Sequence, residues 1–103
     1  MTVANQIIIN AKADEEKTVK SFLNGLVAKA LLEKGCQKFE LYQGDEDRSY
    51  FVIIEIWKSE KRYAMYKESA MYQELQAHKS ISKQTTLGLR LPQCLTKLGL
   101  KKN

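Results

Sequence analysis

Residues 50–58 read Tyr-Phe-Val-Ile-Ile-Glu-Ile-Trp-Lys, and this stretch decides the fold. β-Branched and aromatic residues dominate it, which is typical of a strand. One face carries Phe51, Ile53, Glu55 and Trp57, and the other carries Val52, Ile54 and Ile56. Because both faces are apolar, we expect this strand at the centre of a sheet, covered on both sides.

The residues before this strand predict a hairpin. Residues 36–43, Cys-Gln-Lys-Phe-Glu-Leu-Tyr-Gln, alternate between apolar and polar and indicate a half-buried strand. The polar segment 44–49 is a turn that joins the two strands. Further upstream, residues 3–12 contain a β-branched run and predict another strand.

An amphipathic helix is expected between the first two strands. Asp14 is the predicted N-cap, and Lys34-Gly35 the predicted end. Apolar residues recur every three or four positions, at Val19, Phe22, Leu23, Leu26, Val27, Ala30 and Leu31. One apolar stripe means that one side of this helix lies on the sheet.

A second helix is expected to begin after Ser59, with a kink at Ser69-Ala70. Its weaker, aromatic-rich stripe consists of Tyr63, Tyr66, Ala70, Tyr72 and Leu75. The polar residues 79–88 read as a helix end and a loop. Residues 92–100, which begin with proline, suit a final edge strand, and 101–103 a tail.

The expected order is therefore β-α-β-β-α-β, the ferredoxin-like α+β pattern with an antiparallel four-stranded sheet and both helices on one face. We expect a single domain over residues 1–103, with its core at about 3–100. The other sheet face would be left bare although it is rich in isoleucine. A bare apolar face of this size indicates an interface, and we predict a homodimer that joins sheet to sheet.

Charge and cysteine content narrow the class of protein. The net charge of +5 divides into −1 over residues 1–74 and +6 over residues 75–103. The spread cations and the lack of interleaved aromatics argue against nucleic-acid binding and favour a solvated segment.

Cys36 and Cys94 form no Cys-x-x-Cys pair and, with His78 alone, no zinc site, so we predict free thiols, no metal and a cytoplasmic location. No apolar run approaches the ~20 residues of a membrane span, and no signal peptide is visible.

Three local patterns together resemble the antibiotic biosynthesis monooxygenase family. They are Gly35-Cys36-x-x-Phe39-Glu40-Leu41-Tyr42, then Phe51-Val-Ile-Ile-Glu55-Ile-Trp57-Lys-Ser59-Glu60, then Tyr66-x-x-Ser69-Ala70-x-Tyr72. The likeness covers about residues 3–78. It implies a dimeric α/β barrel. For activity, it implies cofactor-free oxygenation, haem degradation, isomerisation of a small molecule, or a role not yet assigned.

The resemblance also suggests site residues. Family oxygenases use an Asn, a Trp and a Tyr around an aromatic substrate, for which Asn5 or Asn10, Trp57, and Tyr66 or Tyr72 are candidates. Here Tyr66 stands where the family has a helix-two histidine.

Haem-degrading relatives need a strand-one Asn, a helix-two Trp and a histidine ten residues later. Asn5 matches the first, Tyr66 occupies the Trp position, and ten residues on is Gln76. His78 lies two residues beyond, about 200° round a regular helix. This placement counts against haem.

Each candidate also has a plainer structural interpretation. Trp57 and the helix-two tyrosines are expected mainly in the hydrophobic core. His78 is expected at the surface, where it acts as a base or ligand only if it points inward. Asn5 either faces water or holds an oxygen atom through its amide. Glu55, inside an apolar strand, is a base with a raised pKa or, as we favour, a residue with a structural partner such as a cross-strand Lys or Arg. No Gly-rich phosphate motif and no Ser-His-Asp set is present.

The leading hypothesis is a cofactor-independent monooxygenase that acts with O₂ on a small aromatic or quinol-like substrate, of which an anionic form is one option. Asn5, Trp57 and Tyr66 are the predicted catalytic residues, and Tyr63, Tyr72, His78 and Phe22 the predicted substrate contacts. Two alternatives stay open. One is a haem-degrading monooxygenase, and the other is a binding module without catalysis.

Overall fold

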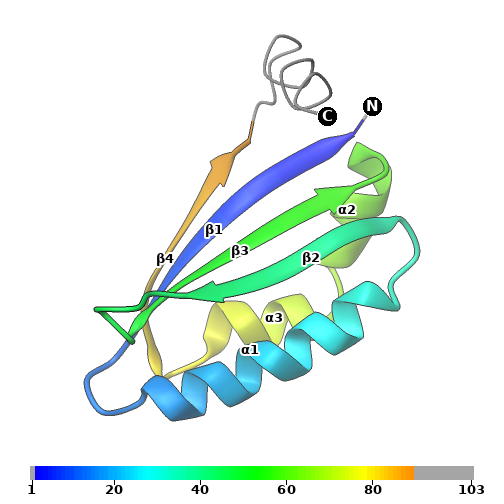
Figure 1. The fold of residues 1–103 in the computed structure, drawn as a ribbon. Coiled ribbons are helices and arrows are strands. Elements are labelled where there is room, and N and C mark those ends of the chain that lie inside the picture. Colours follow the sequence, from blue (N-terminus) through cyan, green and yellow to red (C-terminus); the bar gives the residue numbers. More distant parts are fainter. Residues whose placement is uncertain (1, 90–103) are drawn as a thin grey trace, which may run out of the picture.

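The computed structural model describes residues 2–89 and contains four strands and three helices. The elements are β1 (Val3–Ala11), α1 (Glu16–Leu31), β2 (Cys36–Gln43), β3 (Tyr50–Trp57), α2 (Glu60–Lys67), α3 (Ala70–Ala77) and β4 (Ile81–Gly88). The strands form one antiparallel sheet in the order β2-β3-β1-β4 (Figure 1). This arrangement confirms the predicted ferredoxin-like α+β fold, with its second helix in two pieces. The single domain over 1–103 stays a prediction, since residues 90–103 are outside the description.

The hydrophobic core lies between the sheet and the helices. β3 occupies a central position, as its sequence predicts, and its residues Phe51, Ile53, Glu55 and Trp57 are completely buried. The register pairs Ile7 with Ile53 and Ile9 with Phe51, which brings the β1 isoleucines to the same face. From the helices come Val19, Leu23, Leu26, Ala30, Tyr66 and Leu75. Each large side chain buried here stabilises the fold by roughly 1.5–3 kcal/mol.

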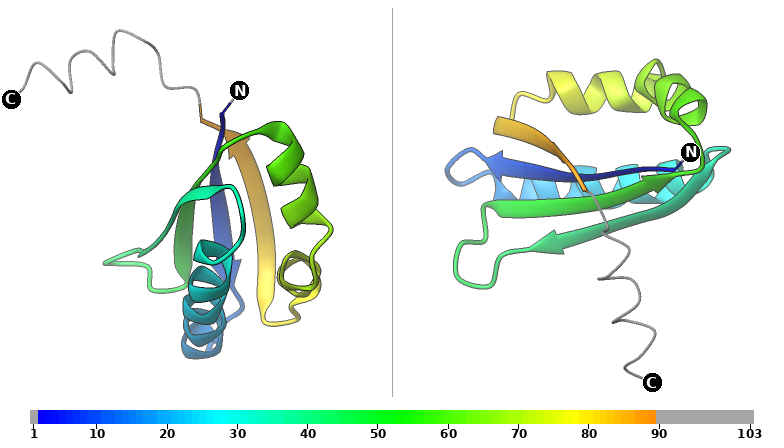
Figure 2. Two further views of the ribbon diagram at one scale, coloured as in Figure 1. Left: turned by 90° about the vertical axis from the view of Figure 1, so that its right-hand side faces the viewer. Right: turned by 90° about the horizontal axis from the view of Figure 1, so that it is seen from above.

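The opposite sheet face carries half-buried apolar side chains. Val52, Ile54 and Ile56 of β3 share this face with Ile8 of β1, which pairs with Val52. The helices cover the other face, with α1 beneath the sheet and α3 alongside β4 (Figure 2). Gln84 of β4 donates a hydrogen bond to the carbonyl of Leu75 at 2.7 Å. The bare apolar face therefore exists as the sequence predicts, and its role in a homodimer stays a prediction.

The ends of α1 differ from expectation. Its N-cap is Glu15, which makes no side-chain cap bond, and Asp14 instead adopts a left-handed backbone with φ of 65°. At the other end Leu31 is 52% exposed, because it is turned by about 100° from the buried Ala30. The predicted stop at Gly35 lies in the loop beyond the helix, with φ of 91° and only 2.5 Å between an added Cβ and Arg62 Cγ. Only glycine fits there.

The predicted kink at Ser69 is a complete break between α2 and α3. The Ser69 hydroxyl accepts a hydrogen bond from the Tyr72 backbone N–H at 3.3 Å and donates one to the Tyr66 carbonyl at 2.6 Å. It therefore caps the start of α3 and satisfies a carbonyl at the end of α2. Ser59 caps α2 in the same way, by accepting from the Arg62 N–H. This confirms the predicted start of the second helix.

The prediction for residues 79–88 is wrong. This segment is not a helix end and loop, because Ile81–Gly88 forms the edge strand β4 and pairs with β1. Hydrogen bonding to β1 satisfies the backbone whatever the side chains are, and a solvent-facing edge accommodates the polar Ser82, Lys83 and Gln84. The predicted strand over 92–100 and the tail at 101–103 lie outside the described residues. Within residues 2–89, no helix is long and apolar enough to cross a membrane.

Candidate functional site

A buried carboxylate lies at the centre of the first candidate region. The register of β1 and β3 places Asn5 opposite Glu55. Asn5 Nδ2 donates to Glu55 Oε2 at 3.0 Å, and Trp57 Nε1 donates to Glu55 Oε1 at 2.9 Å. Glu55 is completely buried and Asn5 is 7% exposed. Glu55 therefore has a cross-strand partner as favoured, but that partner is the Asn5 amide, joined by the Trp57 indole, and not a Lys or Arg. Asn5 does not face water.

Burial changes the proton affinity of this carboxylate. It raises the pKa of Glu55, while the hydrogen bonds from Trp57 and Asn5 and the charge of Lys67 oppose the shift. Desolvation dominates because a charge loses its hydration in the core, and neutral donors replace only part of it. Glu55 therefore has the raised pKa that the sequence offers as the alternative, and it accepts a proton more readily than an exposed glutamate.

An aromatic stack adjoins the carboxylate. The Tyr66 ring lies 4.5 Å from the Trp57 ring with 25° between the planes, and both residues are completely buried. The Tyr66 hydroxyl oxygen is buried and has no hydrogen-bond partner among the described residues. Burial, assisted by the nearby Glu55 charge, raises the pKa of Tyr66. The phenol therefore stays protonated at neutral pH and can donate a hydrogen bond to an oxygen.

Two half-buried tyrosines adjoin this stack. Tyr72 meets the Tyr66 ring edge-on at 5.4 Å, and the Tyr63 ring lies 6.3 Å from Trp57. Burial raises the pKa of Tyr63 to about 12 and also raises that of Tyr72. We call Asn5, Glu55, Trp57, Tyr63, Tyr66 and Tyr72 the carboxylate cluster.

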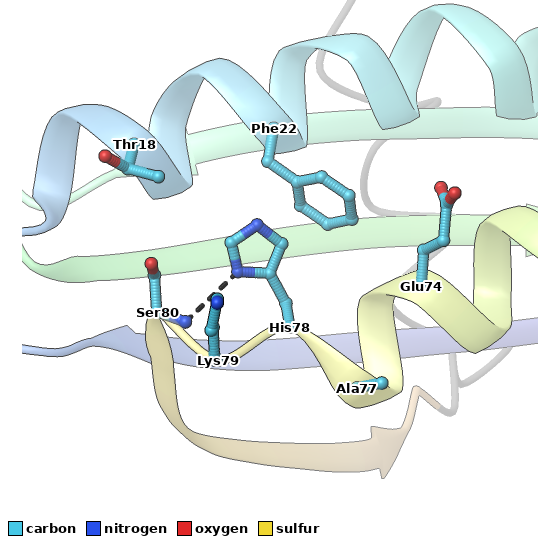
Figure 3. Close-up of a pocket in the computed structure, with 7 residues that line it drawn as sticks. All are labelled: Thr18, Phe22, Glu74, Ala77, His78, Lys79 and Ser80. Carbon is cyan, nitrogen blue, oxygen red and sulfur yellow. Dashed lines mark hydrogen bonds between the residues drawn. The ribbon is translucent and has the colours of Figure 1, made fainter.

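A second candidate region is a hollow of about 640 Å³ between α1 and the turn from α3 to β4 (Figure 3). Its lining consists of Thr18, Phe22, Glu74, Ala77, His78, Lys79 and Ser80. The Phe22 and His78 rings lie 4.3 Å apart at 49°. The volume falls within the ~300–1,000 Å³ range of small-molecule sites. We call this region the histidine hollow.

His78 is not part of the regular helix. It follows the last residue of α3 in an extended conformation, with φ of −69° and ψ of 118°. The 200° rotation expected from a continuous helix therefore does not apply, and the imidazole points inward towards Phe22. Its Nδ1 accepts a hydrogen bond from the Ser80 backbone N–H at 3.2 Å. His78 is half-buried, and it meets the condition that the sequence analysis set, because it points inward.

The sequence-predicted site residues fall into both regions. Asn5, Trp57, Tyr63, Tyr66 and Tyr72 gather in the carboxylate cluster, and Phe22 and His78 meet in the histidine hollow. Asn10, the other candidate on β1, points to the opposite sheet face. The catalytic and substrate-binding roles of these residues stay predictions.

Sequence reasoning missed several residues of the two candidate regions. Thr18, Glu74 and Ser80 carry no recognisable motif, and only the fold brings them to one hollow. The alternation of residues 50–58 places Glu55 and its donor Trp57 on the same buried face. The other donor, Asn5, depends on the register of β1 and β3, which one sequence does not reveal.

The geometry does not fit haem ligation by His78. A neutral imidazole carries one N–H and one lone pair. Because the lone pair of Nδ1 accepts from Ser80, the other nitrogen carries the hydrogen and has no electron pair for iron. Within residues 2–89, no three His, Cys, Asp or Glu side chains are grouped to hold a metal ion.

The fold and the site together define a small ferredoxin-like α+β protein with a carboxylate and an aromatic stack under its helices. The sequence profile of the antibiotic biosynthesis monooxygenase family matches residues 2–78. This chain belongs to that family, which confirms the resemblance seen in the sequence.

Solved structures share the fold at low sequence identity. PA3566 from Pseudomonas aeruginosa is 20% identical with a TM-score of 0.81, over 88% of this chain and 95% of that one. Rv0793 from Mycobacterium tuberculosis is 17% identical with a TM-score of 0.79, over 87% and 94%. A structure described as an antibiotic biosynthesis monooxygenase is 18% identical with a TM-score of 0.77, over 87% and 97%. No curated protein matches the chain.

Proposed function

We propose that this protein is a monooxygenase that uses O₂, with no bound metal or flavin, to oxidise a small hydroxylated aromatic of the quinol or anthrone type. Family membership supports the general class of activity. The observation that carries the proposal is Glu55, a buried carboxylate with a raised pKa beside an aromatic stack whose Tyr66 hydroxyl is unpartnered among the described residues.

The reaction uses the substrate as its own electron donor. For an anthrone, the ring CH₂ loses a proton, and the carbanion gives an electron to O₂ before the two radicals join as a peroxide. Breakage of the O–O bond leaves one oxygen on the carbon as a carbonyl and releases the other as water. The protein supplies a position, a proton acceptor and donors to the developing oxyanion.

Catalytic roles in this proposal belong to Asn5, Trp57 and Tyr66. Tyr66, protonated at neutral pH, donates to the substrate oxyanion, while the Asn5 amide and the Trp57 indole are held in place by Glu55. Trp57 and Tyr66 expose no surface, and the half-buried Tyr63 and Tyr72 lie against them on the solvent side. Phe22 and His78 contact the substrate from the hollow.

Oxygen uptake with a panel of hydroquinones and anthrones tests this proposal. We expect turnover with at least one compound and a loss of roughly 10²-fold in kcat for Tyr66→Phe, which removes one oxyanion donor. Tyr50→Phe, outside both regions, is the matched control. No uptake with any compound would contradict the proposal. If a small molecule then co-purified unchanged, the result would favour a binding module without catalysis.

We also propose a cytoplasmic homodimer that joins the two bare sheet faces. Ile8, Val52, Ile54 and Ile56 form the apolar centre of this face, and each is only half-buried in one chain. Burying them against a second copy removes this apolar surface from water. Equilibrium sedimentation at micromolar concentration is expected to give twice the mass of one chain, and Ile54→Lys to give a monomer. A stable wild-type monomer contradicts the dimer.

A further inference from the structure

The tautomer of His78 is fixed by its surroundings. Because Nδ1 accepts the Ser80 N–H, a neutral ring carries its hydrogen on Nε2. The donating peptide is held in place, since Ser80 is buried and its carbonyl accepts from the Lys12 N–H at 2.8 Å. The Ile81 N–H also donates to the His78 carbonyl at 3.2 Å and closes this turn. The neutral ring of His78 therefore presents an N–H donor at Nε2.

This donor faces the hollow. Phe22 packs against the imidazole at 4.3 Å and limits its rotation. Figure 3 shows the second ring nitrogen turned away from Ser80 and towards α1. No described residue accepts a hydrogen bond from it.

The hollow has two electrostatically different ends. Thr18, Lys79 and Ser80 lie at the end near the Nδ1 side of His78, and Glu74 lies at the other end, beyond Phe22 (Figure 3). Hydroxyls and an ammonium group stabilise an anionic oxygen, whereas the Glu74 carboxylate repels it. The Phe22 ring offers an apolar surface for the body of a flat ligand.

We propose that the histidine hollow binds the ionised oxygen of an aromatic ligand, with His78 Nε2–H as the hydrogen-bond donor and Phe22 as the stacking surface. The ligand class is a phenolate or enolate. This inference rests on the proposed function to the extent that the ligand is the substrate. The anion is electron-rich, and His78 positions it by donating a hydrogen bond.

The tautomer can be measured directly, because the chain has one histidine. In ¹⁵N-labelled protein, two-bond ¹H–¹⁵N correlations of the imidazole ring distinguish a hydrogen on Nε2 from one on Nδ1. We expect the neutral ring to carry its hydrogen on Nε2. A hydrogen on Nδ1 overturns the proposal.

Ligand binding tests the anion preference with a matched pair of probes under nitrogen at pH 8. We expect 4-nitrophenolate to bind roughly tenfold or more tightly than its methyl ether, 4-nitroanisole, which cannot ionise. His78→Leu should abolish this preference, His78→Gln should keep part of it, and Glu74→Gln should increase it. Phe22→Leu should weaken both probes alike. Equal binding of the two probes, or an unchanged preference in His78→Leu, overturns the proposal.

The two proposals fail separately. Preferential binding of 4-nitrophenolate without oxygen uptake from any quinol contradicts the monooxygenase and leaves the anion site intact. Oxygen uptake together with equal binding of the two probes contradicts the anion site alone.

Discussion

The carboxylate cluster and the histidine hollow lie on the same side of one sheet but differ in their relation to water. The cluster has completely buried members, Glu55, Trp57 and Tyr66, whereas all lining residues of the hollow except the buried Ser80 are half-buried or exposed. A change in the cluster therefore acts on the folded state as a whole. A change in the hollow acts mainly on what binds there.

The two regions also differ in how their hydrogen-bonding groups are used. Both oxygens of Glu55 are engaged by donors from its own sheet, so the carboxylate fixes Asn5 and Trp57 before any ligand arrives. His78 uses one nitrogen for Ser80 and keeps the other free among the described residues. The cluster thus has Asn5 and Trp57 already held in place, whereas the hollow keeps a ring nitrogen available to a ligand.

The largest expected effect is loss of stability in Trp57→Ala. Removing a completely buried indole leaves a cavity beside Tyr66 and deprives Glu55 of one donor, so we expect a cost of about 3–5 kcal/mol in the free energy of unfolding. Phe22→Ala, at the half-buried ring of the hollow, should cost less than half as much. Urea denaturation measures both. Equal losses of unfolding free energy in the two variants would contradict this difference between the two regions.

Asn5→Leu should give the next largest effect. Leucine nearly preserves the volume but leaves Glu55 Oε2 buried without its donor, at a cost of about 1–3 kcal/mol. Asn10→Leu is the matched control on the same strand, because that side chain lies on the opposite face of the sheet. If the two variants unfold at the same urea concentration, the hydrogen bond between Asn5 and Glu55 contributes nothing to stability.

Ser69→Ala tests the connection between the two regions. Its hydroxyl caps α3, which leads to His78, and bonds to the Tyr66 carbonyl, so we expect a loss of about 1 kcal/mol. We also expect weaker 4-nitrophenolate binding, since the start of α3 is no longer fixed. Ser59→Ala, at the cap of α2, is the control and should lose stability without affecting that binding. If Ser59→Ala weakens 4-nitrophenolate binding and Ser69→Ala does not, the two regions are coupled through α2.

The smallest expected effect is on the pH dependence of stability. Burial raises the pKa of Glu55 in the folded protein above that in the unfolded chain, so the folded protein holds this proton more tightly. The contribution of Glu55 is complete below the unfolded pKa and is lost as the pH rises through the folded pKa. We expect the free energy of unfolding to fall as the pH rises above about 4.5, and Glu55→Gln to remove this component. Parallel pH profiles for the two proteins would contradict the raised pKa.

Much of the fold follows from local sequence because its strongest elements carry clear periodicity. The alternation in residues 50–58 fixes which side chains of β3 face the helices, and the three-four spacing in α1 fixes its buried stripe. β4 escapes such reasoning because Ser82, Lys83, Gln84, Thr85 and Thr86 have little apolar pattern. An edge strand is held by its backbone pairing with β1, which no local pattern reports.

The site is harder to predict because it depends on pairing between distant segments. Asn5 and Glu55 are 50 residues apart and meet only through the register of β1 and β3. Likewise, His78 points inward because α3 stops at Ala77, one residue before it. Local sequence supplies the residue types, and the tertiary structure decides which of them share a site.

The chain contains a single tryptophan, and the cluster determines its optical properties. The Trp57 indole is shielded from solvent, donates its N–H to a carboxylate and stacks on a phenol. Its fluorescence should therefore be blue-shifted in the native protein and should move to longer wavelength when the stack opens. Every titration and unfolding experiment on this protein thus has a built-in, label-free reporter inside the carboxylate cluster.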